Sequence, residues 1–99
     1  MIIGNSSLSK KAQALLSQLG KPWTKKRIDA ELCVYRDLGD YDIEVSCDGS
    51  STFDIYVWQK SPKLRIVERR YDLERGSAVY NACRELETKY SASDTEAPA

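Results

Sequence analysis

The chain contains no histidine, one phenylalanine, one methionine and three widely spaced cysteines. Histidine is the commonest general acid or base and a frequent zinc ligand, so its absence argues against both kinds of site. Cys33, Cys47 and Cys83 form no Cys-x-x-Cys pair, and we expect three reduced, mostly packed thiols. The sequence therefore predicts no catalytic residue, no metal and no cofactor, and we expect that the protein is not an enzyme.

Long hydrophobic stretches are also missing. No apolar run approaches the ~20 residues that a membrane-spanning helix needs, and residues 1–5 lack the regions of a signal peptide. We therefore expect a cytoplasmic protein that does not contact a membrane. The 99 residues suffice for one domain with a modest core. We place this α+β domain at residues 1–90 and expect a disordered acidic tail at residues 91–99.

Charge is balanced overall but unevenly distributed. Residues 1–27 carry six lysines or arginines and no acid, residues 28–54 carry eight acids and one arginine, and residues 55–84 carry seven bases and three acids. Such blocks create local fields that can steer a charged partner towards one part of a neutral protein.

The strongest strand signal is the sequence FDIYVW at residues 53–58. Its side chains alternate between two faces, with Phe53, Ile55 and Val57 on one face and Asp54, Tyr56 and Trp58 on the other. This period is typical of a half-buried strand. Similar patterns predict neighbouring antiparallel strands at residues 41–47 and 64–71.

The segment from Ile28 to Arg36 is ambiguous, because its apolar residues fit both strand and helix spacing. A strand is favoured, since a two-residue Gly39-Asp40 turn would bring the apolar side chains of Val34 and Val45 opposite each other. A helix over residues 24–37 remains the alternative. With an edge strand at either end of the sheet, both a monomer and a homodimer are open.

Two helices complete the predicted fold. Ser6 or Ser7 can cap a first helix that runs to Leu19, and Gly20 can end it. Asp72 can cap a second helix over residues 73–90. We therefore expect an α+β fold with an N-terminal helix, a four-stranded antiparallel β-meander and a C-terminal helix, packed as a two-layer sandwich. Trp23 should fold back onto the edge of the core.

Turn lengths then set the pairing between strands. A three-residue loop at Asp48 places Val45 opposite Phe53, and also places the carboxylates of Glu44 and Asp54 side by side. A two-residue Ser61-Pro62 loop predicts a cation–π contact between Trp58 and Arg65 and an ion pair between Asp54 and Arg69. In this register Glu68 points inward, and a bulge or an edge position would relieve its burial.

The outward sheet face is the predicted site. Tyrosine, tryptophan and arginine dominate the energetics of protein interfaces. We therefore predict a small protein-binding module, such as an inhibitor, adaptor or accessory subunit of the kind that phages and mobile elements carry. Its predicted partner-binding residues are Tyr35, Glu44, Asp54, Tyr56, Trp58, Arg65 and Arg69.

Nucleic-acid binding is the alternative function. Its basic residues would be Lys25, Lys26 and Arg27, or those between residues 65 and 70. Aromatic side chains on an open sheet face can stack on unpaired bases. The acidic side chains of Asp42 and Glu44 on the same face would repel a polyanion.

Overall fold

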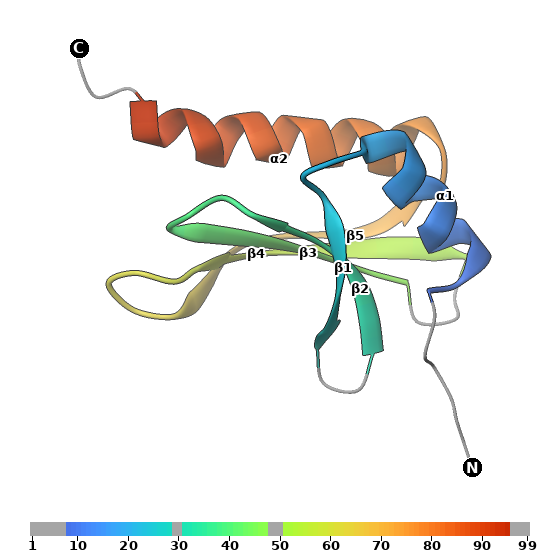
Figure 1. Cartoon of the computed structure of the whole chain (residues 1–99), viewed down its shortest axis with the longest axis horizontal. Helices are drawn as coiled ribbons and strands as arrows, with labels where there is room; N and C mark the ends of the chain where they lie inside the picture. Colours follow the sequence, from blue (N-terminus) through green and yellow to red (C-terminus); the bar gives the residue numbers. More distant parts are fainter. Residues whose placement is uncertain (1–7, 29–30, 48–50, 96–99) are drawn as a thin grey trace.

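The computed structural model describes residues 8–28, 31–47 and 51–95. Its elements follow the order α1 (Lys10–Leu19), β1 (Thr24–Ile28), β2 (Glu31–Asp37), β3 (Tyr41–Ser46), β4 (Thr52–Gln59), β5 (Arg65–Glu74) and α2 (Ser77–Thr95). The strands form one antiparallel sheet in sequence order. Both helices lie on one side of it, and β1 and β2 extend to the other side (Figure 1). The predicted α+β arrangement is confirmed, with five strands instead of four.

The additional strand is β1. We expected one strand from Ile28 to Arg36, whereas the structure has a hairpin in which Thr24 lies opposite Tyr35 and Ile28 opposite Glu31. The alternative of a helix over residues 24–37 is wrong. Four of the five side chains of β1 are exposed, so the strand lacks the apolar alternation on which a sequence-based prediction depends. The run of charged residues also suits the edge of a sheet, because it discourages pairing with another chain.

The core lies between the helices and the sheet. Each inward side chain of the strongest strand is at most 1% exposed, which confirms the predicted inward face of residues 53–58. Fully burying such a side chain contributes about 1.5–3 kcal/mol. The core combines Ala12, Leu15 and Leu19 of α1, Val79, Ala82, Cys83 and Leu86 of α2, and Val34, Ile43, Val45, Phe53, Ile55 and Val57 of the sheet.

Helix α1 begins and ends with local capping bonds. Ser9 is the N-cap, and its Oγ accepts the N–H of Ala12 at 3.2 Å; the two expected caps, Ser6 and Ser7, lie outside the described residues. Gly20 ends the helix at φ 72°, a conformation that favours glycine, and its N–H donates to Leu16 O at 2.9 Å. Trp23 is 4% exposed, which confirms that it packs onto the core.

Helix α2 begins later than predicted and ends later. Asp72 is not its N-cap, because β5 runs on to Glu74 and the helix begins at Ser77. Asp72 lies instead at an irregularity of β5, with φ 60°, and donates its N–H to Asp54 Oδ1 at 3.0 Å. The helix continues to Thr95, so residues 91–95 are helical where a disordered tail was expected. Residues 96–99 lie outside the described part of the chain.

The registers of the first two predicted turns have different outcomes. The Gly39-Asp40 turn is confirmed, since Val34 lies opposite Val45 and Leu38 N–H donates to Tyr41 O at 2.8 Å. Between β3 and β4, however, Val45 lies opposite Ile55 and not Phe53. The expected three-residue loop is therefore too short by two residues. A shift by two keeps every side chain on its predicted face, because the side-chain period of a strand is two.

The predicted register between β4 and β5 is also wrong, and this error changes the face of a predicted site residue. Gln59 lies opposite Arg65 and Trp58 opposite Ile66, so the connection is longer than Ser61-Pro62. An irregularity next to Trp58 then places Tyr56 opposite Arg69. The expected pairs Trp58–Arg65 and Asp54–Arg69 therefore do not form.

Glu68 does point inward, as expected, and a network with α2 accounts for its position. Its Oε1 accepts hydrogen bonds from Lys89 Nζ at 2.8 Å and Tyr90 Oη at 2.7 Å, and its Oε2 accepts one from Arg70 Nε at 3.0 Å. Burial alone would raise the pKa of Glu68, but these three donors lower it to about 2. The carboxylate thereby links edge strand β5 to the second half of α2.

A second network holds the other flank of α2. Glu87 Oε2 accepts the indole N–H of Trp23 at 3.0 Å and Nε–H of Arg36 at 2.8 Å, while Oε1 accepts from Arg84 at 2.9 Å. Arg84 also donates to Leu19 O, the last residue of α1, at 2.9 Å. The Glu87 network therefore joins α2 to α1, to β2 and to the segment between α1 and β1.

The buried thiol of Cys83 gives a test of this packing. Burial raises the pKa of Cys83 from 9.0 to about 12. Because the thiolate is the reactive form, we expect iodoacetamide to modify Cys83 at least about 100-fold more slowly in the folded protein than in urea. Peptide mass spectrometry of samples taken over time measures both rates. Equal rates would show that the packing of α2 against the sheet does not bury this thiol.

Candidate functional site: the open sheet face

The candidate site is the side of the sheet that the helices leave uncovered, called here the open face. Residues directly opposite each other in antiparallel strands share a face, so the pairings identify its members. They include Lys26 and Ile28 from β1, Glu31, Cys33 and Tyr35 from β2, Asp42, Glu44 and Ser46 from β3, Asp54, Tyr56 and Trp58 from β4, and Ile66 and Arg69 from β5.

A recess of about 300 Å³ lies within the open face. All five strands contribute to it, and the β1–β2 hairpin extends on this side of the sheet (Figure 1). Every lining residue is half-buried, so the recess has side-chain walls and remains accessible. We call it the carboxylate recess, and its lining residues are Ile28, Glu31, Glu44, Ser46, Asp54, Tyr56, Trp58 and Ile66.

Aromatic side chains form a fixed wall of the carboxylate recess. Trp58 donates its indole N–H to Glu44 Oε1 at 2.8 Å, which holds the ring in place. The ring of Tyr56 contacts that of Tyr71 edge-on, with centroids 5.9 Å apart. Because these contacts fix the rings before a ligand arrives, binding there costs less side-chain entropy.

Three carboxylates supply the polar part of the carboxylate recess. Ser46 Oγ–H donates to Glu31 Oε2 at 2.8 Å, and Asp54 accepts the N–H of Asp72 as described above. Among the described residues, neither Glu31 nor Asp54 forms an ion pair. Burial, followed by the nearby charge of Asp54, raises the pKa of the Tyr56 hydroxyl.

The prediction that Glu44 and Asp54 lie side by side is wrong. Glu44 lies opposite Tyr56, and Asp54 lies opposite Ser46, because the β3–β4 register is shifted by two residues. The two carboxylates still line the same recess, but from positions that are not directly paired.

The two arginines predicted for the site lie on different faces. Arg69 is exposed on the open face opposite Tyr56. Arg65 lies opposite Gln59, on the side of the sheet that carries the core residues, and donates to Gln59 Oε1 at 3.3 Å. Arg65 is therefore not part of the open face, and the one-residue register error explains why it was placed there.

Tyr35 lies at the β2 side of the open face. The ammonium group of Lys26 lies 4.5 Å from the centroid of its ring, in a cation–π arrangement. Burial and a hydrogen bond with Asp42 raise the pKa of the Tyr35 hydroxyl well above its usual range. This tyrosine is neutral at physiological pH and contributes an apolar ring.

The basic run of Lys25, Lys26 and Arg27 does not form a single patch. Lys26 lies on the open face opposite Cys33, while Lys25 and Arg27 lie opposite Val34 and Leu32 on the other face. Alternation along a strand separates adjacent residues in this way.

Sequence reasoning missed four residues of the carboxylate recess, namely Ile28, Glu31, Ser46 and Ile66. Ile28 and Glu31 join the recess because β1 folds back along β2, and β1 gave no strand signal. Ser46 lies opposite Asp54 only because the β3–β4 register is shifted by two residues from the predicted one. The position of Ile66 on the open face depends on the length of the β4–β5 connection, which the local sequence pattern does not indicate.

Comparisons of the chain with protein-family models, with curated proteins and with solved structures found no match. Within the described part of the chain, no helix is long and apolar enough to cross a membrane. Nor does any group of three histidine, cysteine, aspartate or glutamate residues there have the arrangement of a metal site.

Proposed function

We propose that the chain is a small, non-enzymatic protein-binding module that acts as an inhibitor, adaptor or accessory subunit through its open face. The carboxylate recess carries this proposal. It combines half-buried aromatic and aliphatic walls with acidic groups, and neither helix covers it. Pockets that combine an aromatic anchor point with a few polar groups are typical centres of protein interfaces.

The charge of the recess supports a protein partner over a nucleic acid. Three carboxylates repel phosphate groups, which dominate nucleic-acid affinity. A lysine or arginine side chain of a protein suits the same site, because it can pair with a carboxylate and lie against an aromatic face. Nucleic-acid binding has weaker support, since the basic residues of β1 and of residues 65–70 are divided between the two faces.

Two arginines of β5 provide a matched test of the proposed interface. The variants Arg69→Glu and Arg65→Glu make the same charge change at exposed positions of one strand, but only Arg69 lies on the open face. We expect affinity purification from a lysate of the host cell to recover a protein with wild type and Arg65→Glu. The variants Arg69→Glu and Tyr56→Ala should recover it at least about tenfold less, as expected for interface positions.

Circular dichroism verifies that each variant is folded before purification. Retention of every partner by Arg69→Glu and Tyr56→Ala would refute the open face as the binding surface. Binding of an oligonucleotide to the wild-type chain, with an affinity that falls steeply as salt increases, would instead support the alternative function.

A further inference from the structure

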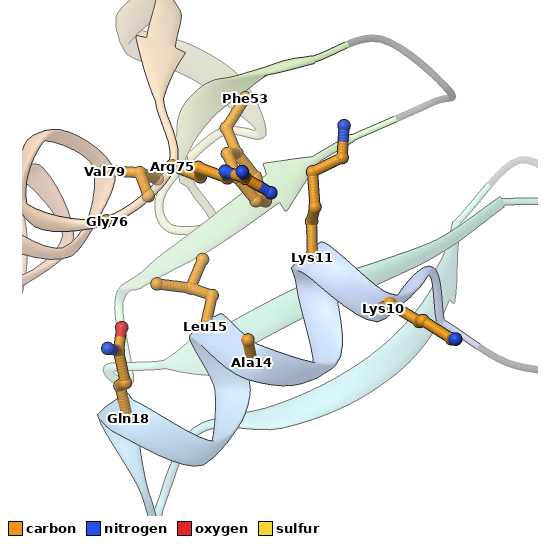
Figure 2. Close-up of a pocket in the computed structure, with 9 residues that line it drawn as sticks. All are labelled: Lys10, Lys11, Ala14, Leu15, Gln18, Phe53, Arg75, Gly76 and Val79. Carbon is orange, nitrogen blue, oxygen red and sulfur yellow. The ribbon is translucent and has the colours of Figure 1, made fainter.

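A second hollow lies on the helix side of the molecule, between α1 and the beginning of α2. Its volume is about 320 Å³, roughly that of ten water molecules. We call it the α1–α2 groove. The side chains that matter for its chemistry are Leu15, Phe53 and Val79 at its floor and Lys10, Lys11 and Arg75 at its rim (Figure 2).

The floor of the α1–α2 groove is apolar. Leu15, Phe53 and Val79 belong to the core and are each at most 3% exposed, so the floor is held by the packing of three elements. Ala14 adds a small, exposed side chain on the α1 side. An apolar side chain can therefore enter the groove beside Ala14, and it reaches the nearly buried ring of Phe53 when Arg75, which lies across that ring, moves aside.

The rim is cationic. Figure 2 shows Arg75 lying across Phe53 and Lys11 extending beside it from α1, while Lys10 points away and adds positive charge at the outer edge. Among the described residues that line the groove, none is acidic. Neither Lys10 nor Arg75 forms an ion pair or hydrogen bond with another described residue.

We propose that the α1–α2 groove binds an acidic peptide segment of a partner protein. An apolar side chain of the segment lies on the floor, and flanking carboxylates pair with the rim. Charge complementarity selects this partner, since the side chains of Lys10 and Arg75 are cations without an ionic partner among the described residues, and no described lining residue is acidic. The apolar floor selects a peptide over a nucleic acid, because a phosphate backbone would use only the rim.

This site is independent of the proposed function of the open face, because it lies on the opposite side of the sheet. The two surfaces also have opposite charges. One chain can therefore contact a basic element with its open face and an acidic segment with its helix side.

Fluorescence anisotropy with a labelled peptide tests the groove. The probe is a hexapeptide with two glutamates on each side of a Leu-Phe pair, and we expect a dissociation constant below about 1 mM. Arg75→Glu should weaken binding at least about tenfold, as charge reversal at a contact does. Ala14→Trp should abolish binding by filling the groove without changing the charge.

Controls separate specific binding from general attraction. Lys63→Glu makes a comparable charge reversal on the exposed β4–β5 connection and should leave the affinity unchanged, as should Trp58→Ala on the open face. Lys10→Glu should weaken binding, because it reverses a charge at the rim. It also places an acid in the first turn of α1, which favours the helix, so the weaker binding would not come from unfolding of α1.

Three results would overturn the proposal. One is the absence of binding at about 1 mM protein, the weak end of specific association. Another is equal affinity for a peptide in which two glycines replace the Leu-Phe pair, which would show that the floor is not used. The third is an oligonucleotide that displaces the peptide and whose own binding is abolished by Ala14→Trp, which would assign the groove to nucleic acid.

Discussion

Replacing Glu87 with alanine is expected to lower the free energy of unfolding by about 2–4 kcal/mol. The carboxylate accepts hydrogen bonds from Trp23, Arg36 and Arg84, and only 16% of its side chain is exposed. Its removal leaves the buried indole N–H of Trp23 without an acceptor and the guanidinium of Arg36 without an anion. Urea denaturation followed by circular dichroism measures the loss.

Glu85 provides the matched control on the same helix. Its side chain is 63% exposed and pairs with Arg70, which also keeps its contact with Glu68. Glu85→Ala should change stability by no more than about 1 kcal/mol, as exposed ion pairs do. Both variants gain the same helix propensity of alanine, so their difference isolates the Glu87 network. Equal losses would mean that this network does not hold the two helices and the sheet together.

Acid should destabilise the protein mainly through Glu68. The pKa of this carboxyl is about 2 in the folded protein, against an ordinary value of 4.5. Because the folded value is the lower one, the stabilisation is complete above about pH 4.5 and is lost as the pH falls towards 2. The difference between the two pKa values corresponds to roughly 3 kcal/mol of stability. This figure is an upper bound, because 18% of the side chain is exposed and solvent screens its interactions.

The variant Glu68→Gln tests this assignment. It should be less stable than wild type at pH 7 and should show a flatter dependence of unfolding free energy on pH between 5 and 2. Some slope remains, because hydrogen bonds from Arg36, Arg84 and Trp23 outweigh burial and lower the pKa of Glu87 as well. Glu74→Gln, on the exposed end of β5, is the control and should keep the wild-type slope. A Glu68→Gln profile that parallels wild type would refute the assignment.

The sequence predicted the parts of the fold that depend on local patterns. The inward face of residues 53–58, the end of α1 at Gly20 and the Gly39-Asp40 turn are all present. Each of these follows from a preference of a few adjacent residues, either for burial on one face or for a backbone conformation. Gly39, for example, has a φ of 94°, which a two-residue hairpin turn accommodates readily with glycine.

The sequence did not predict β1 or the start of α2, and the reason is physical. β1 is stable because it pairs with β2, although four of its five side chains are exposed. Asp72 has the chemistry of an N-cap, yet its backbone N–H bonds to Asp54 across the sheet. Both outcomes depend on hydrogen bonds between distant residues, which local propensity does not contain.

By itself, the sequence determined which side chains of each well-patterned strand point to the core and which point away, because burial imposes a period of two on the residues. The tertiary structure alone decided which outward residues meet. Loop lengths and the irregularities of β5 placed Arg69 beside Tyr56, moved Arg65 to the other face and gathered Glu31, Glu44 and Asp54 around one recess. A one-residue change of register reverses the face of a side chain, so the composition of the open face follows from the connections between its strands.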